Sequence, residues 1–140
     1  MTKKHAQTTA QIPVTVVIPM RNSATTLPDC LRSISTQRYP IDEILVVDNV
    51  SVDSSREIVA SFAKTCSIPV KILRQTVDRG VAASYNRGTK EAKSPFVVFM
   101  TSDVSLPTPL ELEKLVAPLL QDPAIGATFS TSVLPQFIWD

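Results

Sequence analysis

The chain has 140 residues, of which 44% are hydrophobic and 19% are charged, a composition typical of a single globular domain. Its formal net charge is +1, from 14 basic and 13 acidic residues, which argues against a nucleic-acid-binding surface. No apolar run approaches the ~20 residues that a membrane-spanning helix needs, so no membrane span is expected.

Short apolar runs, in which apolar and polar residues hardly alternate, recur along the chain. Such runs are typical of strands that are buried on both faces of a parallel sheet. The predicted strands are 14–18, 44–47, 70–73, 96–100 and 125–129. Pro19 is expected to end the first strand, because proline cannot donate to a sheet ladder. The intervening segments predict helices at 26–37, 54–65, 81–92 and 109–120. This order predicts an α/β fold, a Rossmann-like, doubly wound, mostly parallel sheet with helices on both faces.

The two ends of the chain differ in character. Residues 1–11 are polar and lack an apolar signal core, so we expect a flexible tail before a domain that spans 12–140. Residues 133–140 are apolar and stop without a cap. They predict either a terminal strand or turn docked on this domain, or a domain truncated at its C-terminus. If exposed, this segment would promote self-association.

Two cysteines fall on apolar stripes with helical spacing. Cys30 shares its stripe with Leu27 and Ile34, and Cys66 shares one with Val59 and Phe62. Two buried, reduced, structural thiols are therefore expected rather than a disulfide. Free thiols are typical of a reducing cytosol, so a cytoplasmic location is expected, with the inner face of the membrane as an alternative.

Two aspartates lie just past the ends of predicted strands: Asp48 after the second strand and Asp103 after the fourth. Open α/β sheets bind ligands at the carboxyl ends of their strands. We therefore expect the ends of strands two and four to lie side by side, with both carboxylates lining one cleft. Together they suggest a nucleotide with a metal on its phosphates, although each alone could be an ordinary loop carboxylate. Asp53 is expected to cap the helix that opens with a capping-box pattern at Ser54.

Neither a GxGxxG dinucleotide fingerprint nor a P-loop occurs in the chain, whose three glycines do not have the spacing of either motif. A diphosphate would then need a metal, basic side chains or the end of the fourth strand. Arg79 and Gly80 precede a predicted helix and could place a guanidinium and open backbone N–H groups near phosphates. The alternative is a solvated arginine beside a turn glycine.

Four ordered motifs together resemble family 2 glycosyltransferases, over about residues 12–129. The first is a strand with Pro-x-x-Asn and a following helix of the form Leu-x-x-x-Leu-x-Ser-x-x-x-Gln. The others are a second strand ending in aspartate, a Gly-x-x-x-Ala-Arg-Asn-x-Gly helix, and a strand carrying an Asp-x-Asp metal motif. The matching segments are 14–22 (VTVVIPMRN), 43–53 (EILVVDNVSVD), 80–88 (GVAASYNRG) and 96–103 (FVVFMTSD).

The resemblance implies a GT-A fold and inverting transfer of a sugar from a nucleotide-diphosphate donor to a saccharide or lipid-linked acceptor, as in polysaccharide biosynthesis. It implies that Asp48 contacts the base and that Asp103 binds Mg or Mn. The residues that it places in the donor-binding site are Pro19, Asn22, Asp48, Arg79, Gly80, Asn86 and Ser102.

The chain departs from the family pattern at three positions. Thr101 stands where the first metal-motif aspartate is usual, Val104 where another aspartate often follows, and Tyr85 where arginine is usual. The Thr-x-Asp sequence at residues 101–103 resembles the metal motif of rhamnosyltransferase-like members of the family. One carboxylate should bind a cation more weakly than two.

No motif identifies the general base, since Asp140 is the only carboxylate after Asp122. The chain therefore resembles the donor-binding half of a longer enzyme, expected to be inactive by itself. A non-catalytic nucleotide-sugar-binding module is the alternative function, and a structural α/β fragment without a ligand is a third.

Overall fold

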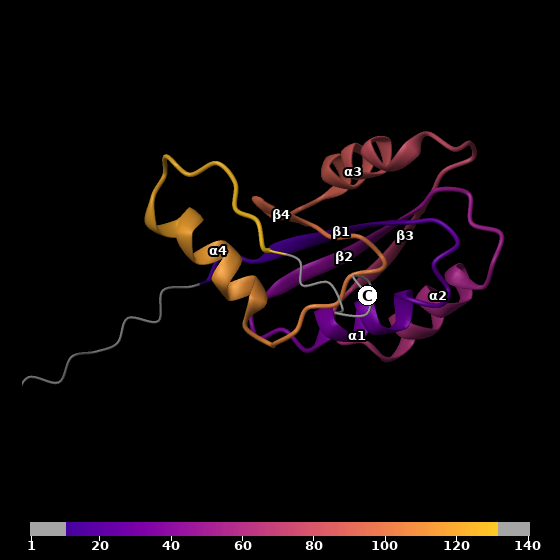
Figure 1. Cartoon of the computed structure of the whole chain (residues 1–140), viewed down its shortest axis with the longest axis horizontal. Helices are drawn as coiled ribbons and strands as arrows, with labels where there is room; N and C mark the ends of the chain where they lie inside the picture. Colours follow the sequence, from indigo (N-terminus) through magenta and orange to yellow (C-terminus); the bar gives the residue numbers. More distant parts are fainter. Residues whose placement is uncertain (1–10, 132–140) are drawn as a thin grey trace, which may run out of the picture.

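A computed structural model describes residues 11–131 and shows a parallel sheet between two layers of helices (Figure 1). The four strands are ordered β3-β2-β1-β4, and every neighbouring pair is parallel. Their bounds are β1 (Val14–Met20), β2 (Ile41–Asp48), β3 (Val70–Arg74) and β4 (Phe96–Phe99). The prediction of an α/β fold with a mostly parallel sheet is confirmed.

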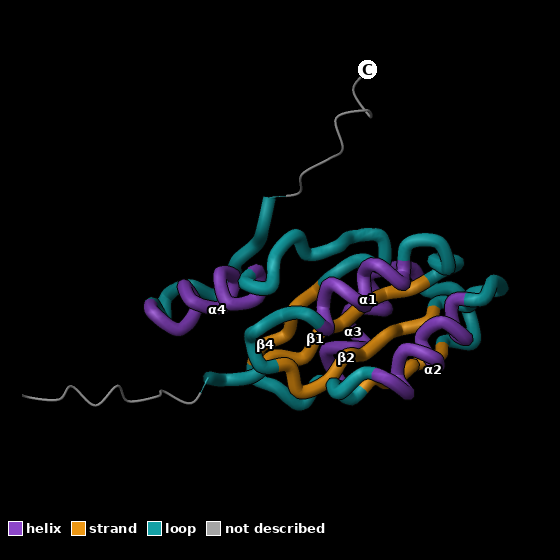
Figure 2. The backbone as a smooth tube through the Cα atoms, turned by 90° about the horizontal axis from the view of Figure 1, so that it is seen from below, coloured by secondary structure: helices purple, strands orange, loops and turns teal. Residues whose placement is uncertain are grey.

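Four helices follow the strands in alternation. They are α1 (Leu27–Ser35), α2 (Ser55–Thr65), α3 (Gly80–Glu91) and α4 (Glu111–Gln121). Figures 1 and 2 show α1 and α2 on one face of the sheet and α3 on the other. Helices on both faces are therefore confirmed, and they leave the carboxyl ends of the strands open at one edge.

The hydrophobic core lies mainly on the face that α1 covers. Val16 and Ile18 of β1 point to this face and pack with Leu31 of α1 and Leu112 of α4. The alternate residue Val17 points to the opposite face, where a smaller cluster packs beneath α3. All seven residues of β1 are buried, because β1 is a central strand covered on both faces.

Pro19 does not end the first strand, contrary to the prediction. The Val17 carbonyl points toward β4 and accepts the Met100 N–H, whereas the Met20 carbonyl points toward β2 and accepts the Asn49 N–H. Backbone polar groups of alternate residues along a strand point to the same side, so Pro19 has the orientation of Val17. Pro19 therefore points its nitrogen toward β4, beyond Val17 and Phe99, the last residue pair that joins β1 to β4. The strand loses no ladder bond at Pro19 and continues to Met20.

The expected neighbour relation of the second and fourth strands is also wrong. The strand order places β1 between β2 and β4, so the ends of β2 and β4 are not side by side. From β1 the chain adds β2 and β3 on one side of the sheet and then β4 on the other side. The carboxyl ends of β1 and β4 are therefore the topological switch point of the sheet.

The predicted strand at 125–129 is not formed. Residues 126–130 lie against β4 and α4 around a cavity of about 480 Å³, without a ladder to β4. The Thr128 hydroxyl donates to the Leu115 carbonyl at 2.6 Å, which ties this segment to α4 instead. Phe129 is 93% exposed as a result.

Asp53 caps α2 as predicted, because its Oδ1 accepts the Ser55 N–H at 3.1 Å, whereas the capping-box pattern at Ser54 is wrong, since Ser54 makes no side-chain capping bond. Cys30 is buried as predicted, but Cys66 is only partly buried because it follows the last turn of α2 in an extended conformation. Neither cysteine forms a disulfide.

The apolar segment 133–140 and nearly all of the expected tail 1–11 lie outside the described residues. Among the helices of residues 11–131, none has the length and apolar character to cross a membrane.

Candidate functional site

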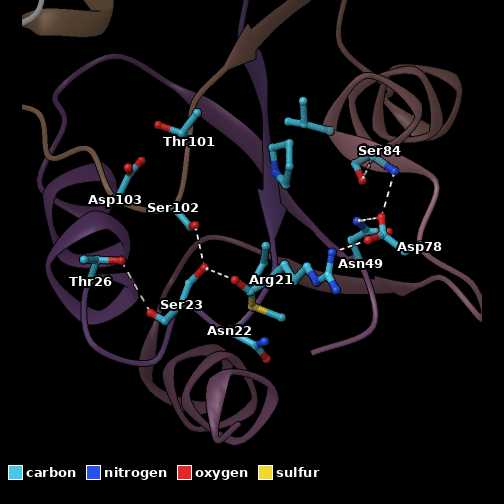
Figure 3. A pocket seen from close by; sticks show the side chains of 14 residues that line it. Arg21, Asn22, Ser23, Thr26, Asn49, Asp78, Ser84, Thr101, Ser102 and Asp103 are labelled. Carbon is cyan, nitrogen blue, oxygen red and sulfur yellow. Dashed lines mark hydrogen bonds and ion pairs between the residues drawn. The ribbon is translucent and has the colours of Figure 1, made fainter. Parts of the chain in front are cut away.

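A cavity of about 580 Å³ opens at the carboxyl ends of β1 and β4, the switch point of the sheet (Figure 3). Its walls are the loop after β1, the loop after β4 and the start of α3. Polar side chains supply most of its functional groups: Arg21, Asn22, Ser23, Thr26, Asn49, Asp78, Ser84, Thr101, Ser102 and Asp103.

The loop after β1 is held in place by the loop after β2. Asn22 has a positive φ of 50°, a conformation that asparagine tolerates better than most residues. Its side-chain oxygen accepts the Val52 N–H at 2.8 Å, and its own N–H donates to the Ser51 hydroxyl at 3.1 Å. The neighbouring Ser23 N–H donates to the Ser55 hydroxyl at 2.8 Å. These bonds fix the floor of the cavity before any ligand enters.

Asp48 lies beneath the site rather than in it. The residue is 1% exposed and does not line the cavity, so the expectation that it shares a cleft wall with Asp103 is not met. Its Oδ1 accepts the Ser51 N–H at 3.0 Å, and its Oδ2 lies 3.7 Å from Arg56 Nη1. In this conformation Asp48 braces the loop that holds Asn22.

Asp78 connects three segments across one side of the cavity. Its Oδ1 accepts the Asn49 amide N–H at 2.6 Å and the Gly80 N–H at 2.9 Å, and its Oδ2 pairs with the Arg21 guanidinium. The Gly80 and Asn49 hydrogen bonds, then the nearby Arg21 charge, hold the pKa of Asp78 below its ordinary value. Gly80 has a φ of 77°, which lets the chain turn sharply into α3.

Asp103 lies on the opposite wall, in the loop after β4. Figure 3 shows it beside Ser102 and Thr101. The hydroxyls of Ser102 and Ser23 lie 2.7 Å apart, which joins this loop to the loop after β1. Burial, and secondarily the Asp103 charge, raises the pKa of the Cys30 thiol to about 12.

Two predicted donor-site residues lie elsewhere. Arg79 and Asn86 line a separate groove of about 590 Å³ on the far side of α3, together with Arg74, Arg87 and Lys90. Arg79 touches the candidate site only through its backbone, whose N–H donates to the Asn49 side-chain oxygen at 3.2 Å. The cavity thus brings together Pro19, Asn22, Gly80, Ser102 and Asp103 of the predicted set.

Sequence reasoning missed Arg21, Asn49, Asp78 and Ser84 as cavity residues. Arg21 and Asn49 stand inside segments that the motifs already marked, and Asp78 lies two residues before Gly80. The signal was therefore their position at strand and helix ends. Only the folded chain shows that these residues, far apart in sequence, face one cavity (Figure 3).

The donor set of the cavity fits a hard divalent cation only in part. Oxygen ligands suit Mg²⁺ and Mn²⁺, and Asp103 offers a carboxylate near the Thr101 and Ser102 hydroxyls. Within residues 11–131, however, no group of three or more His, Cys, Asp or Glu residues could hold a metal ion. A cation there would need most of its ligands from water or from a bound phosphate.

Solved structures with the same fold are glycosyltransferases of the GT-A type. A mannosyltransferase from Pyrobaculum calidifontis, solved with GDP-Man and Mn²⁺, is similar with a TM-score of 0.78 and 30% identity, over 84% of this chain and 35% of its own. S. aureus TarS, solved with UDP-GlcNAc, is similar with a TM-score of 0.68 and 25% identity, over 78% of this chain and 31% of its own. The fold class of this chain is therefore GT-A.

The sequence places the chain more closely. The model of the family Glycosyl transferase family 2 matches residues 15–137, so the chain belongs to that family. Glycosyltransferase AglE of Haloferax volcanii is 34% identical over 94 residues, which are 66% of this chain and 31% of AglE. The poly(ribitol-phosphate) beta-glucosyltransferase of Bacillus spizizenii is 35% identical over 92 residues, 64% of this chain and 14% of that protein. The chain thus spans about a third or less of the length of these relatives.

Proposed function

We propose that the cavity binds a nucleotide-diphosphate sugar and that the intact enzyme transfers this sugar, with inversion, to a saccharide or lipid-linked acceptor. The observation that carries the proposal is the cavity at the switch point, where a carboxylate and several hydroxyl and amide groups converge. Membership of glycosyl transferase family 2 and similarity to a GDP-Man complex support the same ligand class.

Asp103 would hold a divalent cation, Mg²⁺ or Mn²⁺, together with oxygen atoms of the donor diphosphate. The Mn²⁺ in the similar mannosyltransferase supports this assignment. Such a cation offsets negative charge on the leaving diphosphate. Thr101 contributes a neutral hydroxyl where a second carboxylate would strengthen the site, which fits a rhamnosyltransferase-like variant of the metal motif.

The remaining cavity residues would bind and orient the nucleotide. Pro19 and Asn22 form the floor near the nucleoside, Gly80 presents backbone at the start of α3, and Ser102 stands between the two loops. Asp48 would reach the base only if the loop that covers it moved, because the residue is 1% exposed. Arg79 and Asn86 would have to approach from the far side of α3.

The 140-residue chain is expected to bind donor without transferring sugar. Two carboxylates line the cavity within residues 11–131, and Asp103 is assigned to the cation. Asp78 already accepts hydrogen bonds from Asn49 and Gly80 and pairs with Arg21, so it is poorly placed to take a proton from an acceptor hydroxyl. Transfer to an added acceptor well above donor hydrolysis would contradict this expectation.

The single metal-motif carboxylate favours one alternative, a non-catalytic nucleotide-sugar-binding module. Both functions predict donor binding, and they differ in turnover by the intact protein. Transfer by the intact protein would exclude the module, whereas donor binding without transfer would favour it.

A thermal-shift screen with UDP-, GDP-, dTDP- and CDP-sugars, each with Mn²⁺, Mg²⁺ or EDTA, tests the proposal directly. We expect one nucleotide class to raise the melting temperature, more strongly with cation, because ligands that bind only the folded state stabilise it. Free mannose and glucose serve as controls. If no nucleotide sugar shifts the melting temperature at millimolar concentration, the proposal is wrong.

A further inference from the structure

Within the described part of the chain, one positively charged side chain lines the candidate donor cavity. Among the described residues that line it, Arg21 is the only lysine or arginine, whereas Asp78 and Asp103 are both carboxylates. The lining alone is therefore net negative. A diphosphate group brings further negative charge, so it needs a positive partner in the cavity. Asp103 can recruit a cation but cannot itself contact the phosphates favourably.

Arg21 is occupied in this structure by its ion pair with Asp78. The side chains are 55% and 43% exposed, so the pair is open to water, and exposed ion pairs contribute little to stability. Opening the pair therefore costs little. Figure 3 shows the Arg21 side chain extending across the cavity toward Asp78 and Asn49.

Asp78 does not depend on Arg21 for its hydrogen bonds. The Asn49 amide and the Gly80 N–H both donate to Oδ1, at 2.6 Å and 2.9 Å, whereas Arg21 uses Oδ2. Without Arg21, Asp78 would therefore keep both of its hydrogen bonds at the start of α3.

We propose that Arg21 is a ligand of the donor diphosphate, and that Asp78 holds it aside until the nucleotide enters and takes its place. This inference rests on the proposed function and deepens it, since it names a phosphate-binding residue that the motifs do not assign. Arginine suits the role because its planar guanidinium can donate two parallel hydrogen bonds to phosphate oxygens.

The weak metal position makes this residue more important. With Thr101 in place of a second carboxylate, Asp103 would be the only carboxylate of this motif to hold a cation. Arg21 then supplies positive charge that does not depend on metal. The chain is therefore expected to keep measurable affinity for nucleoside diphosphates in EDTA, and that residual affinity should depend on Arg21.

Calorimetry with UDP, GDP, dTDP, CDP and the four matching nucleosides, in EDTA and in Mn²⁺, tests the role of Arg21. In EDTA, Arg21→Gln is expected to weaken binding of the preferred nucleoside diphosphate by about tenfold or more, since charge-assisted bonds to phosphate are lost. Binding of the matching nucleoside should not change. Asp78→Asn should strengthen diphosphate binding severalfold, because the introduced amide keeps an acceptor oxygen for Asn49 and Gly80 but no longer attracts Arg21.

Arg32→Gln is the matched control, because Arg32 also pairs with an exposed aspartate, Asp29, but on α1 away from the cavity. It should bind as the parent does. Equal diphosphate affinity of Arg21→Gln and the parent would overturn the phosphate role while leaving nucleotide binding intact. An unchanged diphosphate affinity in Asp78→Asn would overturn the holding role of Asp78. Absence of nucleotide binding by the parent chain would overturn both this inference and the proposed function.

Discussion

Replacing Gly88 with alanine should destabilise the domain by forcing α3 away from the sheet. Gly88 is a buried residue of α3 that lies directly over Val17 of β1. A Cβ at this position would lie 3.0 Å from Val17 Cγ2 and 3.2 Å from Val17 Cβ, and closer still to Val17 Cγ1. Carbon atoms do not pack this closely, so either the valine or the helix must shift.

The expected loss is about 2 kcal/mol of unfolding free energy. Overpacking a core typically costs about 1–3 kcal/mol, and a clash with a strand buried on both faces belongs at the upper end of that range. Alanine regains up to about 1 kcal/mol through its better helix propensity. For a domain of this size, a net loss of about 2 kcal/mol corresponds to a melting temperature lower by roughly 5–8 °C.

Denaturant titration of four proteins measures this effect: the parent, Gly88→Ala, Val17→Ala and the double variant. Val17→Ala removes the atoms that clash, so the two changes together should cost about 1–2 kcal/mol less than the sum of the single changes. Gly126→Ala is the matched control, because a Cβ there meets nothing within 4 Å. It should change stability by less than about 0.5 kcal/mol.

Two outcomes would refute the reasoning. One is a Gly88→Ala protein as stable as the parent, and the other is strictly additive costs in the double variant. Because α3 also supplies Gly80 and Ser84 to the cavity, a displaced helix should weaken donor binding as well. Val17→Ala alone should leave donor affinity nearly unchanged.

Further predictions concern the metal position and the thiols. Asp103→Ala should lower nucleotide affinity in Mn²⁺ while metal-free nucleoside binding stays nearly unchanged, and Thr101→Asp should strengthen the Mn²⁺-dependent part of the affinity. Calorimetry checks both variants, with the exposed Glu91→Ala as control. Equal nucleotide affinity of Asp103→Ala and the parent in saturating Mn²⁺ would contradict the assignment of Asp103 to the cation. Under native conditions a thiol reagent should modify the partly exposed Cys66 well before Cys30, because burial raises the pKa of the Cys30 thiol to about 12. Rapid modification of both thiols would be inconsistent with the packing of α1. Because the folded pKa of Cys30 exceeds the ordinary value of 9.0, its contribution to stability is complete below pH 9 and is lost as pH rises toward 12, by at most about 1.4 kcal/mol per pH unit. Cys30→Ala should flatten that part of the stability profile, and a profile identical to the parent's would exclude the linkage.

The elements of the fold were predictable because each one is encoded by local pattern. The apolar runs of β1 and β2 have no alternation since both strands are covered on both faces, and that pattern is visible before folding. Periodic apolar residues predicted α1, whose Leu27, Cys30 and Ile34 are all buried. The segment 125–129 misled because its apolar residues indicate contact with the domain but not the form of that contact: residues 126–130 lie against the edge strand β4 without pairing, and Thr128 bonds to α4 instead.

The candidate site was predictable in its location but not in its membership. A position past a strand end identified Asp103, because every parallel strand delivers its carboxyl end to the same edge, and the family resemblance added Ser102. Position in sequence does not reveal which way a side chain points from a turn or a helix. Asp48 is therefore buried under its own loop, and Asn86 faces the far side of α3.

The sequence by itself determined the α/β class, the parallel sheet and the family, since these depend on periodicity and on ordered motifs along the chain. Only the tertiary structure decided that β1 separates β2 from β4 and that Arg21 meets Asp78. Strand order and ion pairs join segments distant in sequence, and they form where packing lowers the free energy of the whole domain. No local pattern carries that information.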